Sequence, residues 1–127
     1  MNGLKLKILN DEYAMHQLQP DGKIPENVYR ADFYSITRTD DELSIIAPAR
    51  IPINSSKVET DYSCMQLIGE FEVSITGVWA SITTILANAG ISVLTVTTYN
   101  TDYFLVKTAH LDKAVAAFKK TDTFLIN

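Results

Sequence analysis

Residues 74–106 carry an ordered succession of backbone signals that restricts the fold more than any other part of the chain. Apolar residues recur at helical spacing over residues 78–89, and Gly90 follows as the residue type that ends helices in a left-handed conformation. Residues 91–98 are rich in β-branched side chains and lead through a polar turn into a strand that starts at Asp102. The segment therefore predicts helix, strand, tight turn and strand in succession.

The flanking segments complete a recognisable order of elements. Residues 65–73 alternate as a strand, and residues 110–120 and 123–126 predict a second helix and a short last strand. Strand-helix-strand-strand-helix-strand is the order of an α+β, ferredoxin-like βαββαβ unit. We therefore expect one domain over residues 61–127 and a separate, mostly β half over residues 1–60.

The first half gives weaker signals. Residues 4–9 and 13–18 alternate as two strands, and Asn10-Asp11-Glu12 between them has the composition of a hairpin turn. Residues 37–45 also align with residues 98–106, since both place Thr, a polar turn, Asp and then an aliphatic strand in that order. This faint repeat suggests a duplication whose first copy has lost or shortened its helices.

Composition narrows the possible partners. Apolar residues make up 46% of the 127 residues and charged residues 20%, which is typical of a folded globular chain. The net charge of −4, with no cluster of basic residues, argues against nucleic-acid binding. No apolar run approaches the roughly 20 residues that a membrane span requires. The single cysteine, Cys64, excludes an intramolecular disulfide and favours a reducing, cytoplasmic setting.

Three motifs of the second half together resemble the ACT domain: Thr76-Gly77-Val78, Ala89-Gly90-Ile91 and Thr101-Asp102-Tyr103. More narrowly, the chain is similar to small bacterial tandem-ACT proteins related to aspartokinase regulatory domains and to CASTOR-type arginine sensors. The resemblance covers roughly residues 61–120, and the first half matches more loosely, as a degenerate ACT-like unit. It implies a ferredoxin-like fold, an amino acid bound at an interface between ACT units, and no catalysis by the domain.

The resemblance also implies where the ligand binds, namely the loop before the first helix and the turn between the second and third strands. The matching positions are Ser74, Ile75, Thr76, Gly77, Val78, Tyr99, Asn100, Thr101 and Asp102. A helix start offers unpaired N–H groups to a carboxylate, and Gly77 allows a close approach. Asp102 can accept hydrogen bonds from an ammonium group.

Structural roles remain open for several of these residues. Thr76, or Ser74 in its place, can simply cap the helix, and Asp102 can simply close a hairpin. Trp79, where the family pattern leads us to expect an aliphatic residue, is a candidate for packing or for an interface.

We expect no cofactor, no metal and no catalytic residue. His16 and His110 have no ligating neighbours at metal spacing, and Cys64 has no basic neighbour that would generate a thiolate. The acidic run over residues 40–42 is expected to be a solvated turn rather than a cation site. No nucleophile–base pair is evident, which disfavours a small enzyme.

Two interpretations of function remain. The first is a non-catalytic amino acid sensor, acting as a homodimer on an unidentified regulated partner. The second is a ligand-free protein-interaction module that uses its sheet edge and Trp79 as the contact surface.

Overall fold

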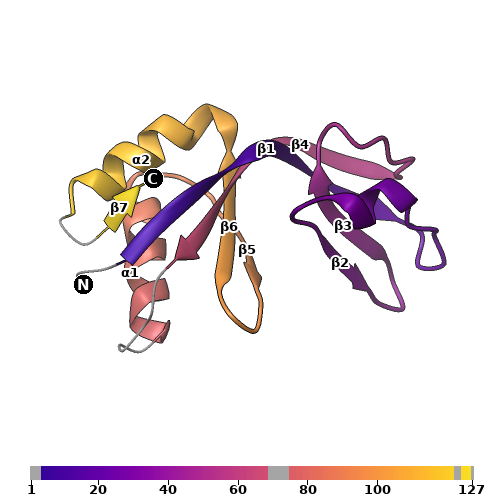
Figure 1. The fold of residues 1–127 in the computed structure, drawn as a ribbon, viewed down its shortest axis with the longest axis horizontal. Coiled ribbons are helices and arrows are strands. Elements are labelled where there is room, and N and C mark those ends of the chain that lie inside the picture. Colours follow the sequence, from indigo (N-terminus) through magenta and orange to yellow (C-terminus); the bar gives the residue numbers. More distant parts are fainter. Residues whose placement is uncertain (1–3, 69–74, 122–123, 127) are drawn as a thin grey trace. The chain divides into compact units, whose positions relative to one another are not determined.

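The computed structural model describes residues 4–68, 75–121 and 124–126 (Figure 1). The strands are β1 (Leu4–Leu18), β2 (Ser35–Arg38), β3 (Leu43–Pro48), β4 (Lys57–Ile68), β5 (Leu94–Thr97), β6 (Asp102–Lys107) and β7 (Phe124–Ile126). The helices are α1 (Ile75–Asn88) and α2 (Leu111–Lys119), with the short 3-10 helices η1 (Glu26–Arg30) and η2 (Thr108–His110). Among the described residues, no helix has the length and apolar character needed to cross a membrane.

The chain divides into two compact units that do not coincide with its two sequence halves. The first, here called the α+β unit, comprises residues 1–10 and 63–127, and the second, the β unit, comprises residues 11–62. A single cut after residue 60 would leave the first ten residues with the β unit. They belong instead to the α+β unit because β1 and β4 are long strands that each contribute to both units.

In the α+β unit, the elements β4-α1-β5-β6-α2-β7 follow the predicted βαββαβ order, and the mixed α+β fold is confirmed. The strand order is β7-β1-β4-β6-β5, so β1 lies between the first and last strands of this motif. β7 pairs with β1 in parallel, whereas β5 and β6 pair antiparallel.

Both helices cover one face of this sheet. Alternate residues of the strands and residues at helical spacing of α1 and α2 form one apolar cluster, which includes Leu6, Met65, Leu67, Val78, Ile82, Leu86, Phe104, Val106, Ala114 and Phe118. The end of α1 follows the sequence prediction. Gly90 has φ 73°, and the N–H of Ile91 donates to the carbonyl of Leu86 at 2.9 Å.

The β unit has the strand order β2-β3-β1-β4 and contains no α-helix in its fully described residues 11–62. Its core lies on one face of the sheet, where Val28 of η1 packs with residues of β1 and β3. The buried members are Leu18, Val28, Leu43, Ile45, Ala47 and Ile51.

Two local expectations are wrong. The predicted turn at residues 10–12 lies inside β1, which runs unbroken because neighbouring backbone bonds to it: the Ala49 N–H donates to the Glu12 carbonyl at 2.8 Å. Thr76 is the second residue of α1 rather than its N-cap, since the helix already begins at Ile75. The alternative cap, Ser74, lies outside the described residues.

Candidate functional site

The turn between β5 and β6 is held by its own backbone and by one threonine hydroxyl. The Thr98 N–H donates to the Thr101 carbonyl at 2.8 Å, and Thr98 Oγ1 donates to the same carbonyl at 2.9 Å. Thr98 Oγ1 also accepts the Thr101 N–H at 3.2 Å. These bonds hold the turn in one conformation and therefore fix the position of the residue with which β6 begins.

Asp102 is that first residue, and its side chain is buried. It is 5% exposed, and it shares a strand face with Phe104 and Val106, which belong to the apolar core beneath the helices. Its Oδ1 atom has no hydrogen-bond partner in the part of the chain that the structure describes. A buried carboxylate oxygen without a partner costs free energy on folding, so its presence calls for an explanation other than packing.

The start of β6 lies next to the end of β4 and the first turns of α1. Thr101 Oγ1 donates a hydrogen bond to the carbonyl of Leu67 in β4. Trp79 in α1 packs edge-on against Phe104 in β6, with ring centroids 6.0 Å apart. These contacts place Asp102, two residues before Phe104 on the same face, near the helix start.

The remaining predicted site residues do not share the environment of Asp102. Gly77 is exposed in the first turn of α1, and a Cβ there would meet no atom within 4 Å, so packing does not require a glycine. Val78 is fully buried in the core, whereas Tyr99 and Asn100 are exposed on the turn. Ser74 lies outside the described residues, and Ile75 and Thr76 are placed by their backbone alone, at the start of α1.

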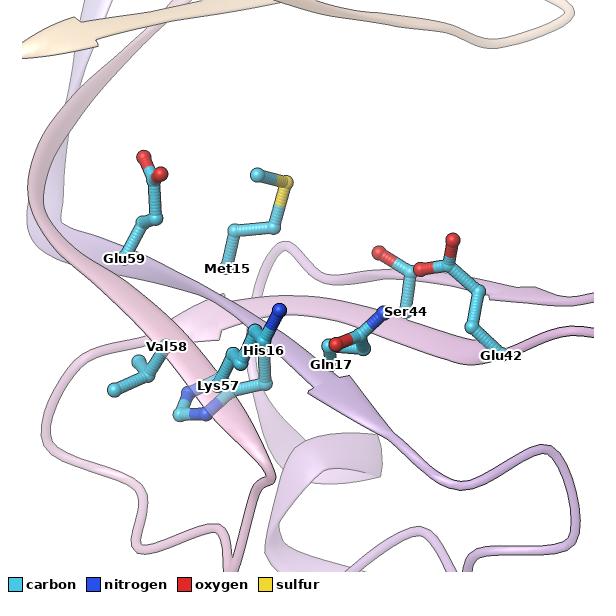
Figure 2. Close-up of a pocket in the computed structure, with 8 residues that line it drawn as sticks. All are labelled: Met15, His16, Gln17, Glu42, Ser44, Lys57, Val58 and Glu59. Atoms are coloured by element: carbon cyan, nitrogen blue, oxygen red, sulfur yellow. The ribbon is translucent and has the colours of Figure 1, made fainter.

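A cavity of about 260 Å³ opens on the β unit, in a region where the sequence predicted no site (Figure 2). It is lined by Met15, His16, Gln17, Glu42, Ser44, Lys57, Val58 and Glu59. These residues come from β1, β3 with its preceding turn, and β4, and only strand pairing brings them together. The alternation of polar residues in each strand was the one available signal, and it does not show which strands are neighbours.

His16 and Cys64 are both buried. The Nδ1 atom of His16 hydrogen-bonds Ser55 Oγ at 3.0 Å, and desolvation by burial lowers the pKa of His16, so the ring is neutral at pH 7. Burial raises the pKa of the Cys64 thiol to about 12, which keeps the sulfur protonated and unreactive. The described residues contain no group of three or more His, Cys, Asp or Glu that could hold a metal ion.

Comparisons with known proteins identify the family of this chain. A sequence profile of the ACT domain matches residues 57–120, half of the chain, and a second profile, described as an N-terminal domain, matches residues 11–54. The crystal structure of the Agobacterium tumefaciens protein Atu0741 is 34% identical in sequence, with a TM-score of 0.87 over 100% of this chain and 96% of that one. No functionally curated protein matches the sequence.

More distant structures share the fold alone. The regulatory subunit of aspartate kinase from Thermus thermophilus, in its ligand-free form, is 13% identical, with a TM-score of 0.62 over 91% of this chain and 95% of that one. A Vibrio cholerae protein of unknown function, described as a possible transport protein, is 19% identical, with a TM-score of 0.67 over 92% and 88%.

The fold and the profile match together define a small regulatory, ligand-binding type of domain. The chain belongs to the ACT-domain family.

Proposed function

We propose that this chain is a non-catalytic, cytoplasmic sensor whose α+β unit binds a small amino acid at the start of β6, beside the start of α1. The observation that carries this proposal is the carboxylate of Asp102, which is 95% buried and has an oxygen without a partner among the described residues. An ammonium group supplies the hydrogen bonds that such an oxygen lacks.

The start of α1 suits the opposite end of the same ligand. The first N–H groups of a helix have no partner within it and carry partial positive charge, which favours a carboxylate. Gly77 is exposed in this first turn and has free space around it. A carboxylate acceptor and a helix start on one side of the sheet together match the two charges of a free amino acid.

We further propose that a second copy of the chain completes the site. Among the described residues, β5 is a terminal strand in the sheet order, so one of its edges presents backbone groups of the kind that pair with another chain. Binding between two copies would couple the ligand to one arrangement of the dimer, because a ligand shifts an equilibrium only by its differential affinity. A regulated protein would read that arrangement.

The rival function, a ligand-free interaction module, rests on the exposed sheet edge and on Trp79. The Trp79 ring packs edge-on against Phe104 and is half-buried, which favours its packing role over a contact role. The exposed edge of β5 serves either function, so a ligand screen has to separate them.

The test is a thermal-shift screen of the purified protein against the twenty amino acids, repeated on Asp102→Asn. We expect the amino acid that binds at Asp102 to raise the Tm of the wild type, because binding to the native state stabilises it, and to have no effect on the variant. The matched control is Asp112→Asn, which removes an exposed carboxylate from the first turn of α2 and should keep the shift. A flat screen with the wild type would favour the interaction module.

A further inference from the structure

The cavity of the β unit occupies the face of its sheet that the core leaves open. In β1, Ala14, His16 and Leu18 are buried, while Met15 and Gln17 alternate with them and point the other way. Gln17 pairs with Ser44 of β3, and the Ser56 N–H donates to the Gln17 carbonyl at 2.8 Å, which brings the start of β4 alongside β1. Three adjacent strands therefore contribute side chains to one open surface.

The charged residues of this surface are Glu42, Lys57 and Glu59. Figure 2 shows Met15, Gln17, Ser44, Glu42 and Glu59 pointing to the same side of the sheet, with the His16 ring on the other side. Because burial lowers the pKa of His16, its imidazole adds no charge at pH 7. The lining thus offers two negative charges and one positive charge.

One of these carboxylates is held in place. Tyr62 Oη donates a hydrogen bond to Glu59 Oε2 at 2.9 Å, and Tyr62 itself is buried. The side chains of Gln17, Glu42 and Lys57 make no hydrogen bond or ion pair with any residue in the described part of the chain. Their donors and acceptors are therefore available to a ligand, beside a carboxylate that is already oriented.

The spacing of the carboxylates restricts the ligand further. Glu42 precedes β3 and Glu59 lies in β4, and β1 separates these two strands in the sheet. Two strand spacings amount to about 10 Å, and the register also offsets the two residues along the strands, because Glu42 precedes the Leu18–Leu43 pair whereas Ser56, three residues before Glu59, bonds Gln17. One small ammonium ion therefore cannot neutralise both carboxylates. A ligand that matches all three charges needs two separated cationic groups and one carboxylate.

We propose that this cavity is a second ligand site, separate from the one at the start of β6, and that it binds a diamino monocarboxylic acid of the lysine or ornithine type. Lys57 binds the ligand's carboxylate, and Glu59 and Glu42 bind its two ammonium groups. Met15 contacts the aliphatic chain between them, since a flexible thioether adapts to such a chain. Gln17 and Ser44 supply neutral hydrogen bonds.

The experiment is a titration of the ¹⁵N-labelled full-length protein with L-lysine, followed by amide NMR shifts, with affinity measured by calorimetry. We expect the shifts to concentrate in residues 15–17, 42–44 and 57–59. Three analogues each lack one group: cadaverine the carboxylate, L-norleucine the side-chain amine and 6-aminohexanoate the α-amine. Each should bind at least about tenfold more weakly, since each loses a charge-assisted hydrogen bond.

Variants test the roles of the individual residues. Glu42→Gln, Glu59→Gln and Lys57→Met should each weaken L-lysine binding by about tenfold or more. Glu12→Gln, which removes an exposed carboxylate from β1, should not change the affinity. Absence of L-lysine binding at millimolar concentration would overturn the proposal, as would equal binding of all three analogues.

The same titration separates this site from the proposed amino acid site of the α+β unit. Asp102→Asn should leave L-lysine binding unchanged. Shifts confined to residues 75–78 and 99–102, with binding lost in Asp102→Asn and kept in Glu59→Gln, would overturn the second site and support the first.

Discussion

The α+β unit and the β unit each contain a four-residue hairpin turn held by a threonine at its first position. In the β unit, the Thr39 N–H donates to the Glu42 carbonyl at 2.9 Å, and Thr39 Oγ1 accepts the Glu42 N–H at 3.2 Å. In the α+β unit, Thr98 makes the same two bonds with Thr101, at 2.8 and 3.2 Å. The two turns are therefore equivalent residue by residue.

The residue that follows each turn differs in kind. Strand pairing sets Arg38 opposite Leu43 in the β unit and Thr97 opposite Asp102 in the α+β unit, so Leu43 and Asp102 occupy the same place. Both are buried, but Leu43 lies in an apolar core and Asp102 has an unpartnered oxygen among the described residues. The equivalent hairpin forms with a leucine at this position. This argues that the carboxylate of Asp102 is not needed to close the turn.

The largest expected effect comes from placing an aspartate, as at position 102 of the α+β unit, at the equivalent position 43 of the β unit. Leu43→Asp removes a fully buried leucine and buries a carboxylate in its place. The lost apolar burial and the desolvated charge together should lower the free energy of unfolding by about 4 kcal/mol or more. Urea denaturation followed by circular dichroism measures this change.

The matched control for this swap is Thr37→Asp, an exposed position in the preceding strand, which should change the stability by less than about 0.5 kcal/mol. A loss at Leu43→Asp as small as that of the control would mean that this place in the hairpin tolerates a carboxylate. The contrast between Leu43 and Asp102 would then carry no information about function.

The reverse swap should stabilise the protein. Asp102→Leu removes a buried carboxylate, one oxygen of which has no partner among the described residues, and adds apolar contact next to Phe104. We therefore expect the free energy of unfolding to rise by about 1–3 kcal/mol. The same variant should show no thermal shift with any amino acid at this site. Urea denaturation and the ligand screen together measure both effects, and a destabilised Asp102→Leu would show that the carboxylate serves the fold.

The sequence pattern correctly predicted those helices, strands and turns whose signals lie within a few neighbouring residues. Gly90 ends α1 as expected, and the residues after it form the predicted strand, turn and strand. It failed at residues 10–12, where a turn-like composition lies inside β1 because the neighbouring strands, 30 or more residues away in sequence, decide the conformation.

The internal repeat was detected with the wrong register. Matching residue types aligned Thr37 with Thr98, whereas the hydrogen bonds make Thr39 the equivalent of Thr98, two residues later. The aspartates at positions 41 and 102 drove the sequence alignment, although only Asp102 is buried. Registers depend on backbone pairing, and for the same reason a cavity lined by three separate strands could not be predicted.

Removing each turn's threonine hydroxyl tests whether the two hairpins are energetically equivalent. Thr39→Val and Thr98→Val keep the branched shape but lose the side-chain hydrogen bonds, so each should cost about 1 kcal/mol. Urea denaturation of both variants checks this, with the exposed Thr84→Val on α1 as a control that loses no turn hydrogen bond. Unequal losses, with one variant unchanged, would contradict the equivalence of the turns.

The smallest expected effect concerns the buried His16 of the β unit. Burial lowers its pKa in the folded state below the ordinary value of 6.5, so on acidification the unfolded chain binds a proton first. This contribution to stability is complete above pH 6.5 and is lost as the pH falls toward the folded-state pKa. At pH 6 the loss is at most about 0.8 kcal/mol for a single proton. Urea denaturation at pH 7 and pH 6 should show a smaller decrease in the free energy of unfolding for His16→Gln than for the wild type. A wild type that gains stability relative to His16→Gln on acidification would show that His16 is protonated in the folded state.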